Sequence, residues 1–557
     1  MMRHRPNRTS ALACTAAAAL LLTTMSSCKG SANSNSNAGA AGGSALTIQG
    51  DAGNPTLVEN FNPLQPSTEL HGTFLMYEPL EIPSPIDGTY TSYLATGHKF
   101  SDPKTLVYTV RPSVKWSDGK AFTPADVTFT FNLLKKFPAL DSNGVWQQIS
   151  GVTASGNDVT FTFKAPNVPF ASVISQVPIV PEHAWSSVAD PVKFPNPKPV
   201  GTGPFSLDKF APTQYTLKKN ASYWQADKIT PSQVLFPAQA SNQNTNQLDV
   251  TSGKFDWSYN FLPDVKRTYV SRDSAHNVYW FPPGGAIGLY LNLTKAPYSD
   301  PNFRKGLSAA LDRKTIAVKA VNGYLDQASQ SGLILPNLKK WLDPSLPNSG
   351  NVTRDASAAK AAFARAGYTM QGGKLVKGGK QATMTIVMPG NFTDWVAAAK
   401  EVANQLGQIG IKVTADLPQF AQYSQSIQAG TFDAAIGGFG GTGSPYTDYN
   451  NALNSTFAAP VNTPSANNFE RFKDPAVDQA LATLASATDE AAQTQATYKL
   501  EHVLYDSTPV LLMYYGGSWG LFSTKRFKGW PSADDPYTLP TNYNNSLLTV
   551  LTHLTKA

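Results

Sequence analysis

Two glycine-rich segments have residue types and spacings that could support chemistry. The first, Gly516-Gly517-Ser518-Trp519-Gly520, matches the GxSxG pattern that presents a nucleophilic serine, and Asp534 and His553 follow it in the order of a hydrolase triad. Such a serine must lie between a strand and a helix, yet the residues after Gly520 have no helical apolar face. The pattern favours a strand that ends in a glycine turn, and a secreted serine hydrolase that uses Ser518 stays the alternative.

The second segment, Gly438-Phe439-Gly440-Gly441-Thr442-Gly443, matches GxGxxG and follows a predicted strand. In a dinucleotide site a helix begins at the last glycine, so that its N-terminus faces the pyrophosphate. Here Ser444-Pro445-Tyr446-Thr447 follows and predicts a turn. We therefore expect a tight bend or a close backbone approach to a ligand, and no cofactor.

The sequence contains no pattern typical of a metal site or of a phosphate-binding loop. The histidines form no HExxH motif and no pair at the spacing of helical metal ligands, and no GxxxxGK[ST] occurs. We expect neither a metal site nor catalytic residues.

The elements that would position these segments are clearest between residues 382 and 449. Residues 384–388 alternate as a strand, 396–406 keep helical spacing, and 411–413 open a second strand. A second helix over 418–429 and an apolar run over 432–439 complete the series. Strand, helix, strand, helix, strand predicts a parallel sheet with right-handed crossovers.

Ligands of such a sheet bind at the carboxyl ends of its strands. The two loops expected there are Pro389–Trp395 and Gly440–Tyr449. We therefore expect the functional site along this edge of the sheet.

The first half of the chain predicts an α+β block. Residues 106–110 and 159–163 alternate as half-buried strands, and Thr123, Pro124 and Asp126 have the spacing of a capped helix start. The proline-rich segment 194–199 breaks this pattern and predicts a lobe boundary.

Composition excludes several classes of protein. Hydrophobic residues make up 41% of the 557 residues, and only 15% are charged, against about 25% in ordinary soluble proteins. The net charge of +7 comes from scattered basic residues without the Lys/Arg runs typical of nucleic-acid binding. We expect a globular protein of several domains and no nucleic-acid partner.

The N-terminus has the features of an export signal. Three arginines precede the apolar stretch Ala11–Leu22, which is too short to span a bilayer, and Met25-Ser26-Ser27-Cys28 resembles a bacterial lipobox. The resemblance implies a signal peptide over 1–27, a diacylglycerol on Cys28 and a membrane anchor, and residues 28–44 have the composition of a flexible tether. The alternative is a secreted protein with an incidental thiol.

Several separated motifs together resemble one family. They are Asn60-Phe61-Asn62-Pro63-Leu64, Tyr77-Glu78-Pro79-Leu80, Arg111–Lys120 leading into Phe122–Val127, Gly201-Thr202-Gly203-Pro204-Phe205 with Asn220 and Tyr223-Trp224, Leu291-Asn292, Arg304, and Ala310-Leu311-Asp312-Arg313. This set is similar to the family 5 extracellular solute-binding proteins, the oligopeptide- and dipeptide-binding lipoproteins of ABC importers.

The resemblance implies an α/β, bilobal periplasmic-binding-protein-like fold (type II, cluster C) with an extra α+β subdomain on the first lobe. Lobe I would comprise 45–75, 200–283 and 516–557, the subdomain 76–199, and lobe II 284–515. The chain would cross between lobes near 284 and 515, where Gly284-Gly285 and Gly516-Gly517 can absorb backbone rotation. It also implies a monomer outside the cytoplasmic membrane that closes around a solute and delivers it to permease subunits.

Peptide-binding relatives hold the peptide's amino terminus with an aspartate, and the matching position here is Thr442. Either Asp448 reaches the same place, or the solute lacks an ammonium group, as oligosaccharides do. Oligopeptides are the first expectation, and oligosaccharides or another solute remain alternatives. The expected ligand-binding residues are Asn62, Trp257 and Tyr259 before the sheet and Trp395, Phe439, Thr442, Tyr446, Asp448 and Tyr449 along its edge.

Overall fold

The structure is a computed structural model that describes residues 45–50, 55–65, 70–240, 242–335 and 337–557. The expected signal peptide, tether and Cys28 lie outside the described residues. All of the fold below belongs to the unit Gly43–Ala557. We propose the lobe boundaries given above and keep the names lobe I, subdomain and lobe II for those residue ranges.

The largest sheet has five strands in the order β18-β17-β19-β13-β20. Their bounds are Lys412–Asp416 (β18), Thr383–Val387 (β17), Ala434–Phe439 (β19), Pro283–Leu291 (β13) and Val510–Gly517 (β20). β17 pairs parallel with both β18 and β19, through crossovers that contain α10 (Thr393–Gln408) and α11 (Phe420–Ala429). The predicted parallel unit is confirmed, and β13 makes the sheet mixed because it pairs antiparallel with β19 and β20.

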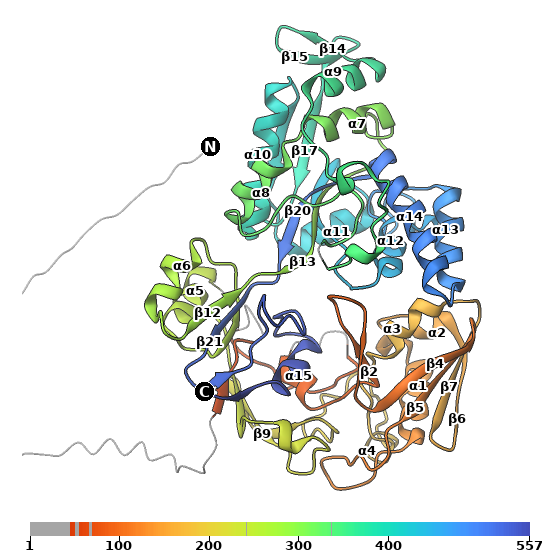
Figure 1. The fold of residues 1–557 in the computed structure, drawn as a ribbon, viewed down its shortest axis with the longest axis vertical. Coiled ribbons are helices and arrows are strands. Elements are labelled where there is room, and N and C mark those ends of the chain that lie inside the picture. The colour runs from red at the N-terminus through yellow and green to blue at the C-terminus, as the bar shows by residue number, and fades with distance from the viewer. Residues whose placement is uncertain (1–44, 51–54, 66–69, 241, 336) are drawn as a thin grey trace, which may run out of the picture. The chain divides into compact units, whose positions relative to one another are not determined.

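Two strands continue from this sheet into lobe I. β12 (Asn277–Trp280) leads directly into β13, and β20 leads into β21 (Gly520–Ser523), so that the five-stranded sheet joins the small sheet β11-β21-β12 (Figure 1). β11 is Trp257–Tyr259. The two crossing segments are tied together, because the amide of Ser518 donates to the carbonyl of Pro282 at 2.8 Å.

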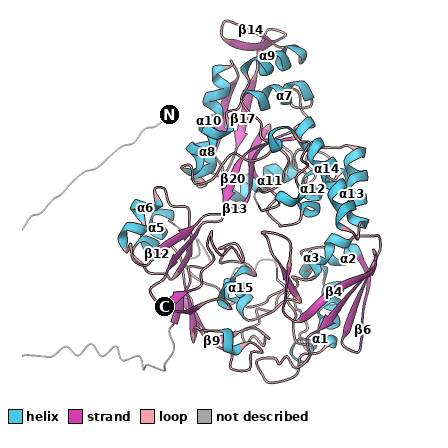
Figure 2. Cartoon of the chain, in the orientation of Figure 1, coloured by secondary structure: helices cyan, strands magenta, loops and turns pink. Residues whose placement is uncertain are grey.

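Lobe I and the subdomain each contain a four-stranded sheet, whose strands Figure 2 shows in magenta. The first is β1-β10-β9-β8 and the second β4-β5-β7-β6. Their strands are β1 (Ala45–Thr47), β8 (Phe205–Ala211), β9 (Gln214–Lys219), β10 (Gln233–Pro237), β4 (Ala95–Asp102), β5 (Thr105–Val110), β6 (Ile149–Ser155) and β7 (Asp158–Phe163). The predicted strands over 106–110 and 159–163 are confirmed as β5 and β7.

Short strands and helices complete the fold. The remaining strands are β2 (Glu81–Pro83), β3 (Tyr90–Ser92), β14 (Thr369–Gln371), β15 (Lys374–Lys377), β16 (Lys380–Gln381), β22 (Phe527–Lys528) and β23 (Thr555–Lys556). The remaining α-helices are α1 (Pro124–Lys136), α2 (Val145–Gln148), α3 (Ala171–Ile174), α4 (Glu182–Trp185), α5 (Gln243–Thr251), α6 (Val265–Thr268), α7 (Pro301–Ala310), α8 (Arg313–Val321), α9 (Ala356–Arg365), α12 (Pro445–Leu453), α13 (Pro475–Ser486), α14 (Glu490–Ser507) and α15 (Ser546–Leu551). Within the described part of the chain, no helix combines the length and apolarity needed to cross a bilayer.

The start of α1 follows the predicted capping pattern. The amide of Thr123 donates to the Asp126 carboxylate at 2.9 Å, and Pro124 occupies the first helical position. The cap therefore satisfies a helix-end amide that no intrahelical carbonyl can reach.

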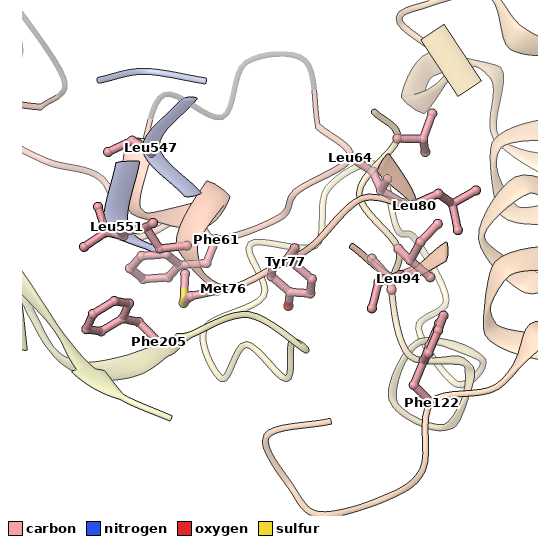
Figure 3. Close-up of a cluster of buried hydrophobic side chains, with 14 of the residues drawn as sticks. Phe61, Leu64, Met76, Tyr77, Leu80, Leu94, Phe122, Phe205, Leu547 and Leu551 are labelled. Carbon is pink, nitrogen blue, oxygen red and sulfur yellow. The ribbon is translucent and has the colours of Figure 1, made fainter. Parts of the chain in front are cut away.

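Lobe I and the subdomain share one apolar core. Buried side chains of both, from Leu46 and Leu217 to Phe131 and Phe161, belong to a single contiguous cluster. Figure 3 shows part of it, with Phe61 and Leu551 of lobe I and Tyr77 and Leu94 of the subdomain in the same cluster. The subdomain is therefore packed onto lobe I as part of the same body.

Arg313, from one of the motifs above, connects two helices of lobe II to the crossing strand β20. The guanidinium of Arg313 is 1% exposed and donates to the Leu512 carbonyl at 2.7 Å, the Ser308 carbonyl at 2.8 Å and the Ser308 hydroxyl at 2.9 Å. Burial lowers the pKa of Arg313 to about 10, so it stays protonated at neutral pH. It holds α7 and α8 against β20.

We expect Arg313→Ala to destabilise the protein by about 3–5 kcal/mol, because charge-assisted hydrogen bonds contribute about 1.5–3 kcal/mol each and their acceptors would stay buried without partners. Chemical denaturation measures this loss. The matched control is Arg354→Ala, which removes an exposed arginine bonded to Gln408 and should change stability by less than about 0.5 kcal/mol. Equal stability of the two variants would contradict the role given to Arg313.

Candidate functional site

A cavity of about 300 Å³ lies where the ends of β13, β19 and β20 meet lobe I. Lobe II and the crossing strands contribute backbone from three glycine-rich segments, Gly284–Gly285, Gly438–Gly441 and Gly516–Gly517. The other lining residues include Pro85 from the subdomain and Tyr259, Ser518, Leu539, Thr541, Tyr543 and Asn544 from lobe I. None of the described residues that line this central cavity carries a charged side chain.

The glycines allow three segments of the chain to approach closely. A Cβ on Gly284 would lie 2.3 Å from the Ser518 hydroxyl oxygen, and a Cβ on Gly441 would lie 2.1 Å from the Gly284 carbonyl oxygen. Gly441 also has a φ of +95°, a conformation that side chains disfavour. The tight bend predicted for 438–443 is therefore confirmed, and it places lobe II backbone directly against the crossing strand β13.

The segment after this bend differs from the prediction. Ser444 caps α12, accepting a hydrogen bond from the Thr447 amide at 3.3 Å, so a helix begins at Pro445 where a turn was expected. The turn prediction was wrong because Ser-Pro at the N-cap and first helical position is also a helix start. Two amides of the bend, those of Gly441 and Thr442, are already hydrogen-bonded within the protein.

Those amides are bonded to Asp448. Its carboxylate accepts from the Gly441 amide at 3.1 Å, the Thr442 amide at 3.2 Å and the Thr442 hydroxyl at 2.7 Å. Burial raises the pKa of the Asp448 carboxyl to about 6, although the Thr442 and Gly441 hydrogen bonds oppose the rise. Asp448 lines a separate cavity of about 160 Å³ beside Tyr290. Because its carboxylate is hydrogen-bonded to the glycine bend, its role in this structure is to support the bend.

A family model described as bacterial extracellular solute-binding proteins, family 5 Middle, matches residues 89–460. The chain belongs to this family. Two Agrobacterium fabrum relatives are similar over most of their length: a probable peptide-binding protein, YejA (24% identical over 526 residues, 82% of this chain and 83% of the relative), and a peptidoglycan-binding protein, YepA (25% over 509 residues, 80% of each).

Solved structures show the same bilobal type II fold, which confirms the expected fold class. A Thermotoga maritima oligopeptide-binding protein of an ABC transporter superposes with a TM-score of 0.84 at 24% identity, covering 92% of this chain and 99% of that one. The mannohexaose-bound structure of that transporter's binding protein gives 0.77 at 25% identity, covering 92% and 98%. Bacillus subtilis AppA, in complex with a nonapeptide, gives 0.72 at 19%, covering 92% and 99%.

In this family 5 protein the structure brings four expected site residues besides Asp448 to the cavities. Tyr259 lines the central cavity, where its hydroxyl lies 3.4 Å from the Gly517 carbonyl oxygen and hydrogen-bonds with the hydroxyls of Tyr543 and Ser518. Phe439 lines both the central and the Asp448 cavities. Thr442 and Tyr446 line a third cavity, on the outer side of the glycine bend.

Three expected residues are core residues instead. Trp257 is fully buried, and its indole nitrogen donates to Pro540 at 3.3 Å. Tyr449 is also buried and donates to Ser331 at 2.6 Å. Asn62 is buried and donates to Pro191 and Phe194, both at 2.9 Å. Their polar atoms hold backbone together, so the expectation that they face a ligand is corrected.

Trp395 lies near the site but lines none of the three cavities described above. It belongs to an aromatic cluster in which its ring lies 5.0 Å from Phe392 and 6.0 Å from Tyr423. Phe392 stacks on Phe420, which is 53% exposed. Because β17, β18 and β19 are parallel, this cluster lies along the same edge of the sheet as the glycine bend.

Sequence reasoning missed the C-terminal contribution to the cavity. Thr541, Tyr543 and Asn544 come from a loop before α15, and Tyr543 packs edge-on against Tyr259 with ring centroids 5.2 Å apart. The only signal was a run of Asn and Thr side chains around one tyrosine, which is equally typical of a surface loop.

The hydrolase constellation is not assembled. Ser518 is 2% exposed and is followed by a strand, β21. The ring of His553 stacks on Tyr537 with centroids 4.0 Å apart, and its Nδ1 lies 2.8 Å from the Thr549 carbonyl oxygen. The family is one of binding proteins, and the GxSxG match marks a crossing strand.

We expect Gly441→Ala to destabilise the protein by about 2–4 kcal/mol, since a left-handed φ costs about 1–3 kcal/mol for a residue with a side chain and the new methyl would clash with Gly284. Chemical denaturation measures this change. Gly438→Ala is the matched control in the same segment, because its Cβ would meet nothing within 4 Å. A variant at 441 as stable as the one at 438 would contradict the proposed close approach.

We expect the stability difference between wild type and Asp448→Asn to depend on pH. A carboxyl whose pKa is raised from 3.8 to about 6 on folding favours the folded state fully below pH 3.8, and loses that contribution as the pH rises through about 6. A rise in pKa of this size corresponds to about 3 kcal/mol. Wild type should therefore lose up to this amount relative to the variant between pH 4 and pH 7.5, measured by denaturation at each pH. A constant difference would contradict the raised pKa.

Proposed function

We propose that this protein is the ligand-binding component of an ABC importer, which captures an oligomeric solute between its lobes and presents it to permease subunits. The observation that carries the proposal is the central cavity, which is lined by both lobes and by the two strands that join them. The proposal includes a diacylglycerol anchor on Cys28, a position outside the cytoplasmic membrane and a monomeric state.

Lobe closure follows from the way the cavity is divided. Tyr259 and Tyr543 line it from lobe I, and Gly438–Gly441 line it from lobe II. A ligand that contacts both walls binds the closed form more tightly than the open form, and only such differential affinity shifts the population. The glycines at the crossing strands can absorb the rotation.

Oligopeptides are the first candidate ligand. Support comes from the peptide-binding relative in Agrobacterium fabrum and from the nonapeptide complex of the Bacillus subtilis neighbour. The cavity lining is uncharged and Asp448 is engaged by its own loop. We therefore propose that a peptide is held through its backbone and uncharged groups, without an ionic anchor for its ammonium.

Oligosaccharides are the second candidate. The same uncharged lining contains the hydroxyls of Tyr259, Ser518 and Thr541 and the amide of Asn544. These groups are hydrogen-bonded within the protein, and a polyhydroxyl ligand could exchange those bonds for its own. The mannohexaose-bound neighbour supports this candidate.

We expect N-acetylation of a nonapeptide ligand to change its Kd by less than about threefold, because no carboxylate lines the central cavity to lose its partner. Isothermal titration with the free nonapeptide, its N-acetylated form and mannohexaose measures this. A tenfold loss on acetylation, about 1.4 kcal/mol, would contradict neutral recognition. Heat from mannohexaose alone would select the second candidate, and absence of heat from all three would contradict both.

A further inference from the structure

The third cavity described above, on the outer side of the glycine bend, lies between the subdomain and lobe II and is called the outer cavity below. We propose that it is a second compartment for the ligand of the central cavity, and that it binds a neutral ring at the far end of a long ligand. The inference rests on the proposed function. The ring is either a pyranose unit of an oligosaccharide or an aromatic side chain of a peptide, since both offer a flat apolar face with oxygen or π acceptors.

The outer cavity has about the same volume as the central one, about 300 Å³. The subdomain lines it with the β2–β3 hairpin and Tyr90, and lobe II lines it with Thr442–Tyr446, with Trp341 of the short helix Lys339–Trp341, and with α14. Figure 1 shows the hairpin that contains β2 pointing from the subdomain toward lobe II. The outer cavity is therefore formed jointly by the subdomain and lobe II.

Two amphipathic side chains face the outer cavity with unused polar groups. Trp341 and Tyr446 are half-buried against the apolar core of lobe II and line the cavity. Neither the indole N–H of Trp341 nor the hydroxyl of Tyr446 hydrogen-bonds to another described residue. Buried aromatic side chains of these types usually find hydrogen-bond partners, so both are suited to donate to a ligand.

Polar groups elsewhere in the outer cavity are mostly engaged within the protein. Gln493 donates to the Ala487 carbonyl at 3.0 Å, and the Thr497 hydroxyl donates to the Gln493 carbonyl at 2.8 Å. The charged lining residues Asp87, Lys340 and Glu490 are exposed, and the Lys340 ammonium lies 5.0 Å from the centre of the Trp341 ring. His98 also lines the cavity, and its Nδ1 lies 2.5 Å from the Glu81 carboxylate. Apart from these charged groups, the cavity presents aromatic side chains and two donors without partners among the described residues, which fits a neutral ring.

The two cavities share a thin wall. Pro85 and Gly441 line the central cavity, and their neighbours Ser84 and Gly443 line the outer one. The wall is a non-covalent contact between two loop tips, where a Cβ on Gly443 would lie 2.7 Å from the Ser84 carbonyl oxygen. A ligand chain can pass this point when the lobes are open and be enclosed when they close.

The volumes of the two cavities indicate how ligands of different lengths would bind. Each cavity alone is at the lower limit of the roughly 300–1,000 Å³ typical of ligand sites. Short ligands therefore occupy the central cavity, and longer ones extend into the outer cavity and gain contacts with Trp341 and Tyr446.

The test compares ligand lengths. Isothermal titration uses mannobiose against mannohexaose, and a tripeptide against a nonapeptide that carries a C-terminal tyrosine, with wild type, Trp341→Ala, Trp341→Phe and Tyr446→Phe. We expect Trp341→Ala to weaken the long ligand at least tenfold and the short one less than twofold. Trp341→Phe and Tyr446→Phe, which keep the rings, should weaken the long ligand about threefold. If only the mannose oligomers lose affinity in this length-dependent way, the ring is a pyranose; if only the peptides do, it is an aromatic side chain.

The matched control is Tyr498→Phe, a half-buried tyrosine of α14 that does not line the outer cavity, and it should leave every Kd unchanged. Equal losses for short and long ligands, or none, would overturn the second compartment alone, provided that wild type binds. Wild type that binds neither series would overturn the proposed function and this inference together.

Discussion

The structure depends on the contact of glycine backbones where the chain crosses between its lobes. Gly284 of β13 leaves room for the Ser518 hydroxyl on one side, and Gly441 of the bend after β19 packs on its carbonyl. A methyl group at Gly441 would clash with the Gly284 backbone, and one at Gly284 would require the Ser518 side chain to move. Because the cavity wall consists largely of backbone, its polarity comes from peptide groups and a few hydroxyl and amide side chains, and it carries no net charge.

A second constraint explains the motifs that identify the family. Glu78 is buried and accepts from the Tyr223 hydroxyl at 2.9 Å and the Trp224 indole at 3.0 Å, so two separate motifs meet in one hydrogen-bonded group. Burial raises the pKa of Glu78 to about 7. A Cβ on Gly201 would lie 1.8 Å from the Met76 carbonyl oxygen. These motifs hold chain segments together and do not touch the cavities, so they identify the fold without specifying the ligand.

Local patterns predicted the elements but not which aromatic side chains reach a cavity. The strands over 384–388 and 432–439 and the cap at Thr123 follow from periodicity and short-range hydrogen bonding. Trp257 was expected to face a ligand and is instead packed on Phe522 and Trp530, whereas Trp341 attracted no attention and lines a cavity. The local sequence around an aromatic residue is the same whether the residue packs in the core or lines a cavity, because its burial depends on what other segments pack against it.

The amino-acid sequence alone determined the α/β class, the parallel strand-helix-strand-helix-strand unit at the sheet edge and the family, since these depend on residue spacing and on short motifs. Only the tertiary structure decided that Asp448 supports the glycine bend, that Tyr543 joins Tyr259 across the central cavity, and that the subdomain shares a core with lobe I. The Tyr543–Tyr259 contact and the shared core join residues tens to hundreds of positions apart, and the role of Asp448 depends on which buried groups find hydrogen-bond partners. A local sequence pattern does not specify either.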